Sequence, residues 1–376
     1  MDINMDMTRE YIRQPDEAWF STLADLRKSA WDSAQASRTL KGNLGNLSFT
    51  NVSGEIALDT SSGKKLFPNK HAFGQLTTEL GGAARYLRSK PTDLAVENLN
   101  HDLELYRADA AKDDRLQKLL VTEIEGRSSL RAVTGPDYGR IWNYQAADLS
   151  AEVNEAANGT FYNPPVWPGT GRGHDHGGLW LNDRQIILFF IDGGSMVDGG
   201  GERDQMYRGY VMRNSEVGDA KFFWELFYFR VVCGNLMIMG KQQVAEVSII
   251  HRKHANEHFK TMAPEMTNLL SVDTRAQTER IIRAAKGIEL PRTPFHKGER
   301  QDDSKLLEFK PLQAFPKALA KRGIATAIAE EGNCNNLWEL VQGLTAEARM
   351  LPVAQDRFAA SAKASKMLEI AEAELV

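Results

Sequence analysis

The chain has 376 residues, of which 42% are hydrophobic and 26% are charged. This length and composition are those of an ordinary globular protein, and they exclude a disulfide-stapled mini-protein and a wholly disordered chain. The 46 basic and 50 acidic residues give a net charge of -4, so no overall excess of positive charge points to nucleic acid as a partner.

Cysteine content and hydropathy predict a soluble protein of a reducing compartment. The two cysteines, Cys233 and Cys334, form no CxxC pair and cannot build a disulfide framework. The acidic start of the chain lacks the basic and apolar segments of a signal peptide. Apolar runs such as 186–191 fall far short of the roughly 18 to 20 residues that cross a bilayer. We therefore expect a cytoplasmic protein with no membrane partner.

The first region, residues 1–110, is expected to be mixed but mainly helical. The run 49–58 alternates loosely between apolar and polar residues and predicts two strands around Gly54. The segment 69–80 has apolar residues at helical spacing, and a second helix is expected to open at Pro91.

The central region, residues 120–260, is expected to be an α+β domain. Its predicted strands are 129–133, 139–142, 186–191 and 206–213. A helix is expected over 146–157, and the glycine-rich run 193–201 is expected to be a flexible link. The aromatic run 221–232 fits neither the helical nor the strand period, so its structure stays open.

The last region, residues 261–376, is expected to be helical. Asn336 followed by Glu339 has the spacing of a helix capping box, and 354–375 is rich in Ala, Lys and Glu. The predicted class is therefore α+β: a central, mostly antiparallel sheet with helices, flanked by helical N- and C-terminal regions.

Several blocks of the sequence together resemble the phage/plasmid-like protein family, catalogued as domain of unknown function 932. These blocks are His71 to Leu76, Glu97 to His101, Leu130 to Val133 with Tyr138, Arg140 and Asn143, Asn214 to Gly218, Arg230 to Asn235, and Asn336 to Leu344. The resemblance covers about 65–345 in the family's order and departs from it at 81–84. It implies an origin in a phage or plasmid of a bacterial cell, and it implies neither an established activity nor catalytic residues.

Two groups of histidines are candidate ligand sites. His174, Asp175 and His176 lie in the glycine-rich stretch 158–178, and imidazole with carboxylate suits a divalent metal. The alternative is a solvated loop that binds no cofactor. His251, His254 and His258 would share one face if they were helical, where neighbouring lysines and arginines favour an anion over a metal.

A structural polar network is predicted around the strongest family blocks. Its members are Asn214, Glu216, Arg230 and Asn235. Arg230 lies inside an apolar run, so it needs a partner or a route to solvent, and Glu216 and Glu225 are the acidic residues available to it.

Arginines and aromatic residues of the central region predict contact with nucleic acid. The expected phosphate ligands are Arg131, Arg140, Arg172 and Arg184, and the expected stacking residues are Trp142 and Tyr144. The order of elements is also similar to that of phage single-strand annealing proteins, by architectural analogy alone. Residues 127–260 hold 14 Lys/Arg and 15 Asp/Glu, so such a surface requires segregated charge.

The leading hypothesis is a non-catalytic protein that binds single-stranded DNA, with annealing in recombination as its process and a homo-oligomer as its state. One alternative is an oligomeric structural or host-interaction protein. The other is a metal-dependent enzyme that uses the loop of His174 and His176.

Overall fold

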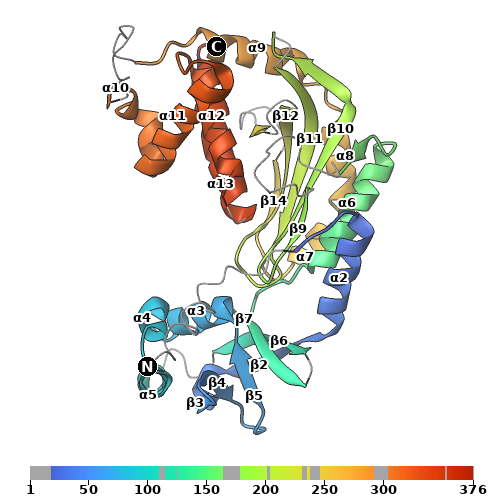
Figure 1. Ribbon diagram of the computed structural model, residues 1–376. Coiled ribbons are helices and arrows are strands. Elements are labelled where there is room, and N and C mark those ends of the chain that lie inside the picture. The colour runs from blue at the N-terminus through green and yellow to red at the C-terminus, as the bar shows by residue number, and fades with distance from the viewer. Residues whose placement is uncertain are drawn as a thin grey trace.

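The computed structural model describes residues 18–109, 115–124, 126–163, 178–200, 204–230, 235–237, 246–291, 304–351 and 354–375. Within these ranges the chain forms two lobes, each built on its own sheet (Figure 1). Nearly all strand pairs are antiparallel and helices pack around both sheets, which confirms the predicted α+β class.

The N-terminal lobe holds a six-stranded sheet. Its strands, in spatial order, are β2 (Ser37–Asn43), β6 (Leu116–Ile124), β7 (Arg127–Thr134), β5 (Lys65–Pro68), β4 (Glu55–Asp59) and β3 (Ser48–Val52). The helices of this lobe are α3 (Lys70–Glu79), α4 (Ala84–Arg88) and α5 (Thr92–Ala108). Apolar side chains of α3 and α5 pack on one face of the sheet, where they meet Leu119 and Val121 of β6.

The C-terminal lobe holds an eight-stranded antiparallel sheet. Its main path is β1 (Ala18–Trp19), β9 (Leu179–Leu181), β10 (Ile186–Asp198), β11 (Gln205–Asn214), β12 (Phe222–Arg230) and β13 (Asn235–Met237). Off this path, β8 (Phe161–Tyr162) pairs with β10, and β14 (Glu246–Ile249) pairs with β12.

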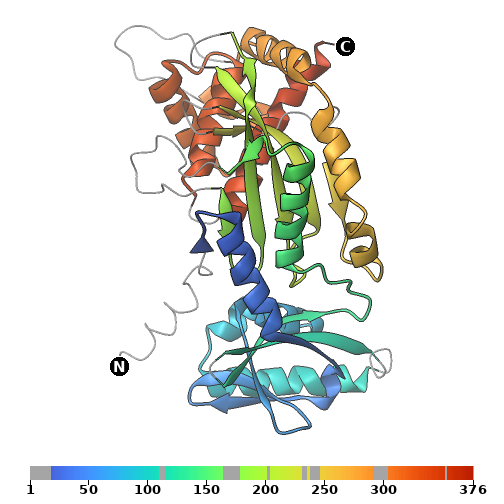
Figure 2. The same cartoon turned by 90° about the vertical axis from the view of Figure 1, so that its right-hand side faces the viewer.

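Helices enclose this second sheet from both sides. They are α2 (Leu23–Gln35), α6 (Asn143–Ala156), α7 (Ala255–Phe259), α8 (Ala263–Ser271), α9 (Arg275–Gly287), α10 (Ser304–Leu307), α11 (Lys317–Glu331), α12 (Leu337–Arg349), α13 (Ala354–Ser365) and α14 (Glu369–Ala373). Figures 1 and 2 show α6 and α8 on one side of the long strands and α13 on the other.

Several local predictions are confirmed. Strands β3 and β4 form a hairpin whose turn, Ser53–Gly54, has positive φ at both residues, a conformation that glycine adopts readily. Helix α3 begins after Asn69, whose side chain accepts the Ala72 amide. The capping box of Asn336 and Glu339 opens α12.

Other local predictions are wrong. Residues 139–142 form no strand, and β7 pairs instead with β6, whose apolar run has no clear period. Strand β10 continues through 193–198, where a register shift absorbs the glycines that suggested a flexible link. The predicted terminal helix is broken between α13 and α14 by a 3-10 turn at Lys366–Leu368.

The two largest apolar cores divide the described chain differently from the domain boundaries expected at 110–120. The core of the N-terminal lobe contains residues between Leu44 and Val133. The core of the C-terminal lobe contains Leu26 of α2 together with Ile141 and later residues. The N-terminal lobe is therefore an insertion between α2 and α6. No helix among the described residues is long and apolar enough to cross a membrane.

Candidate nucleic-acid interface at the lobe junction

The turn between β11 and β12 links the two lobes through several hydrogen bonds. We call Ser215 to Asp219 the junction turn. The carbonyl oxygen of Val217 lies 3.1 Å from His71 Nε2 and accepts a hydrogen bond of 2.9 Å from Gln75 Nε2. His71 and Gln75 are one turn apart on α3, so a single helix face holds the turn. The Gln75 Oε1 atom also accepts the Val133 amide, which ties the turn to β7.

A buried ion pair fixes the next residue of the turn. Arg131 Nη2 lies 2.7 Å from Glu216 Oε1, with side chains that are only 10% and 2% exposed. Arg131 is the extra residue of a bulge, because Ala132 pairs with Leu120 while Leu130 pairs with Val121. The bulge aims Arg131 out of the regular ladder.

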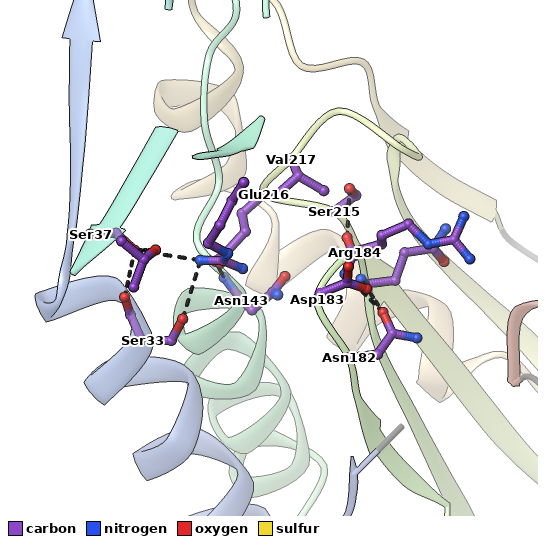
Figure 3. Close-up of polar contacts among 12 residues, drawn as sticks. Ser33, Ser37, Asn143, Asn182, Asp183, Arg184, Ser215, Glu216 and Val217 are labelled. Atoms are coloured by element: carbon purple, nitrogen blue, oxygen red, sulfur yellow. Dashed lines mark hydrogen bonds and ion pairs between the residues drawn. The ribbon is translucent and has the colours of Figure 1, made fainter. Parts of the chain in front are cut away.

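Two helices complete the environment of this ion pair. The Asn143 amide, at the start of α6, donates to Glu216 Oε2 over 3.1 Å, where the helix dipole favours a carboxylate. The Arg131 guanidinium also donates to Ser33 Oγ of α2 over 3.2 Å. Figure 3 shows Glu216 between Ser33 and Ser37 on one side and Asn182 to Arg184 on the other.

Neighbouring polar groups hold both ends of the turn. Asn214 Nδ2 donates to the Ile141 carbonyl and to Asn143 Oδ1, each over 2.9 Å. Tyr138 Oη donates to the Ser215 carbonyl over 2.9 Å, and Ser215 Oγ donates to the Arg184 carbonyl over 2.8 Å. Three blocks that carry the family resemblance, around 71–76, 130–143 and 214–218, therefore meet at one place.

A cationic cluster lies beside the junction turn. Lys41 of β2 is directly opposite Lys118 of β6, and both project from the sheet face away from α3 and α5. Burial and the nearby charges of Lys41 and Arg140 lower the pKa of Lys118. Its Nζ donates to the Tyr138 carbonyl over 2.8 Å. Along the described chain, neither lysine forms an ion pair with a carboxylate, although Asp137 is close enough to Lys118 to act on it electrostatically.

Two aromatic rings flank the third cation of this cluster. The Arg140 guanidinium lies 5.4 Å from the centroid of the Tyr138 ring and 5.5 Å from that of Trp142. It donates one hydrogen bond to the Glu216 carbonyl, while its Nη2 atom has no hydrogen-bond partner among the described residues. Tyr138, Arg140 and Trp142 are all half-buried. Cations and ring faces thus stand together where the two lobes meet.

The structure separates the arginines that were predicted to contact phosphate. Arg140 and Trp142 lie in the cationic cluster. Arg131 is buried and paired with Glu216, so its guanidinium has no open face for a phosphate in this arrangement. Arg184 lies on the other side of the turn, 3.6 Å from Asp219. Arg172 lies outside the described residues.

Tyr144 belongs to a separate surface group. Its ring meets that of Trp31 at right angles with centroids 4.7 Å apart. The Arg27 guanidinium lies 5.4 Å and 6.0 Å from the two centroids and is 2.6 Å from Asp148. Because its cation is already paired, this group links α2 to α6 and leaves little free charge for a phosphate.

Only two of the four residues of the predicted polar network, Asn214 and Glu216, lie at the lobe junction. Glu216, one of the two acidic residues that the sequence offered to Arg230, pairs with Arg131. Arg230 is at the opposite end of β12, where its backbone pairs with Asn235 and Met206. The side chains of Arg230 and Asn235 are outside the description.

The histidine predictions have mixed outcomes. His174, Asp175 and His176 lie outside the described residues, and the residues that are described contain no group of three or more potential metal ligands. His251 and His254 precede α7, which begins at Ala255, so the three histidines do not share one helix face. His251 is buried, its Nδ1 lies 3.1 Å from the Gly139 carbonyl, and burial lowers its pKa to about 4.

Sequence reasoning missed Lys41, Lys118 and the partners of the junction turn on α3. The lysines were missed because β2 and β6 carry no clear alternation, so their register could not be deduced. His71 and Gln75 did offer a signal, since both occur in a family block at helical spacing.

Comparison with known proteins assigns a family to one part of the chain. Residues 194–300 match the family model described as Domain of unknown function (DUF932), which confirms the family expected from the sequence for this segment. The segment includes the junction turn and α7. No curated protein and no solved structure shows significant similarity to the chain.

Proposed function

We propose that this protein binds single-stranded nucleic acid at the lobe junction and does not catalyse a reaction on it. The observation that carries the proposal is the cluster of Lys41, Lys118 and Arg140. Like charges directly opposite each other on adjacent strands repel, and the partial burial of Lys118 strengthens that repulsion. An anion that binds between the two lysines offsets this repulsion, and phosphate is an anion that lysine and arginine bind well.

The flanking rings favour a single strand over a duplex. Trp142 and Tyr138 lie within about 5.5 Å of the Arg140 guanidinium and are half-buried, each with part of its surface open to solvent. An unpaired base can stack on an aromatic ring or an arginine plane, whereas bases in a duplex are already stacked. Stacking requires no particular base, so we expect little sequence preference.

Fluorescence anisotropy with a labelled single-stranded oligonucleotide at low salt tests the proposal. Lys41→Glu should weaken binding by roughly tenfold and reduce the salt-dependence slope by about 1, because one phosphate contact is lost. Lys321→Glu makes the same charge change on α11, at the far end of the C-terminal lobe, and should bind as the unmodified protein does (Figure 1).

Two results would overturn this function. One is the absence of any anisotropy change at tens of micromolar protein. The other is equal affinity of the Lys41→Glu and Lys321→Glu variants, which would place any binding elsewhere.

The finer parts of the proposal rest on the family resemblance and the architectural analogy. They are a cytoplasmic role in a phage- or plasmid-bearing cell, annealing of complementary strands during recombination, and assembly as a homo-oligomer. A strand-annealing assay and multi-angle light scattering test the last two. If the protein binds single strands as a monomer and does not accelerate annealing, both the oligomer and the annealing role are wrong.

A further inference from the structure

The two lobes share a very small apolar contact. Each has its own core, and the cluster between them contains three buried residues, Leu120, Ala132 and Val217, with Trp142 packed against it. The rest of the described junction is polar, built from the ion pair and hydrogen bonds of the junction turn. Lobes joined by small polar interfaces are expected to move relative to each other.

A second cationic segment reaches this junction from the C-terminal lobe. The segment Arg252–Lys253 precedes α7, and its backbone lies directly on Gly139: a Cβ atom at Gly139 would be 1.9 Å from the Arg252 carbonyl oxygen. The rings of Tyr138 and His251 are stacked, with centroids 5.1 Å apart. The Tyr138 carbonyl accepts a hydrogen bond from the Lys118 ammonium. Tyr138 and its neighbour Gly139 therefore connect the segment Arg252–Lys253 to the cationic cluster.

Arg252 and Lys253 are both exposed, and in the described part of the chain neither pairs with a carboxylate. Of the acidic groups nearby, Glu257 pairs with His254 and the buried Glu216 pairs with Arg131, while Asp137 is close enough to Lys118 to act on it electrostatically. Positive charge therefore borders the junction from both lobes, despite the net charge of -4 of the whole chain.

We infer that the ligand site bridges the two lobes, with Lys41 and Lys118 holding phosphates on one side and Arg252 and Lys253 holding them on the other. This inference rests on the proposed function and adds the form of the ligand: a polyanion with several phosphates in a row, and not a mononucleotide. A strand bound in this way restrains the lobes, because it favours the arrangement in which both cationic groups contact it.

The first experiment measures oligonucleotide affinity across a salt series for two variants of the same segment. Lys253→Glu should weaken binding roughly tenfold and lower the salt slope by about 1. Lys260→Glu, at the other end of α7 and also exposed, is the matched control and should stay within about twofold of the unmodified protein. A mononucleotide should bind all three proteins with the same weak affinity.

The second experiment measures amide hydrogen exchange in the junction turn. Addition of the oligonucleotide should slow exchange at Val217 to Asp219 in the unmodified protein and have a much smaller effect in the Lys253→Glu variant.

The outcomes distinguish the inference from the function it rests on. If Lys41→Glu weakens binding and Lys253→Glu does not, the site is confined to the N-terminal lobe and the bridging inference fails alone. If the unmodified protein binds no oligonucleotide, both fail. If the oligonucleotide binds but amide exchange at the junction turn does not change, the inference that the ligand bridges the lobes also fails.

Discussion

At the scale of single residues, Glu216 is the centre of the junction. Its carboxylate pairs with Arg131 and accepts the first amide of α6, and its carbonyl accepts Arg140. A charge buried to this degree is tolerated only with its partner in place, because the desolvation cost of each ion is otherwise uncompensated. The pair therefore ties the bulge of β7 to the turn of the other lobe.

Glu216→Gln should destabilise the protein by roughly 3–5 kcal/mol, because it leaves the buried Arg131 cation unpaired. Denaturant unfolding measures this. Glu55→Gln is the matched control, since Glu55 pairs with Arg127 at the surface with both side chains 49% exposed, and it should cost less than about 1 kcal/mol. The double variant Arg131→Met/Glu216→Leu should recover much of the loss. Equal effects of the two glutamine variants would contradict the assigned role.

His251 should make stability depend on pH. Burial lowers its folded pKa to about 4 from the ordinary value of 6.5, so the unfolded chain takes up the proton first as the pH falls. The stability present above pH 6.5 should decline towards pH 4, by roughly 3 kcal/mol in total. His251→Asn keeps a donor for the Gly139 carbonyl and removes the titration. If the stability of the His251→Asn variant falls by the same amount between pH 6.5 and 4, other groups cause the decline.

At the scale of elements, close backbone packing decides how the crossing from β7 to α6 meets α7. Gly139 donates its amide to the His251 carbonyl over 3.4 Å, and the Arg252 carbonyl fills the space where a side chain would begin. The segment 139–142, predicted as a strand, is instead an irregular connection that hydrogen-bonds to His251, Glu216 and Asn214.

Gly139→Ala should therefore destabilise the protein by roughly 1–3 kcal/mol, because its Cβ would overlap the Arg252 carbonyl and force the backbones apart. Gly135→Ala, in the same connection, has no atom within 4 Å of its added Cβ and should change stability by less than about 0.5 kcal/mol. Thermal unfolding of the two variants compares them directly. If both alanines are tolerated equally, the close approach at Gly139 is not a constraint.

At the scale of the whole molecule, two cores of unequal size share little apolar surface. The N-terminal lobe is an insertion with its own core, so we expect it to unfold separately from the larger lobe. Within this near-neutral chain, Lys41 and Arg140 lie close enough to Lys118 to lower its pKa. Lys41 and Lys118 lie outside residues 127–260, so the even charge balance of that range does not describe this cluster.

Calorimetry should detect the two cores as a departure from two-state unfolding. The calorimetric enthalpy should exceed the van't Hoff enthalpy, and Glu216→Gln should widen the separation between the two transitions because it weakens the link between lobes. A single transition with equal enthalpies in both proteins would mean that the lobes unfold as one unit.

Local chemistry in the sequence by itself determined the class of the fold and many elements. Asn69 and Asn336 cap helices through their own backbone neighbours, and the turn at Gly54 depends on residues next to it, so short-range interactions suffice. The family blocks also pointed to the residues that build the junction. Only the tertiary structure decided the partner of Glu216, the insertion of one lobe into the other and the position of Lys41 opposite Lys118 on adjacent strands. Each of these depends on strand register and on contacts between residues far apart in the chain, which no local pattern encodes.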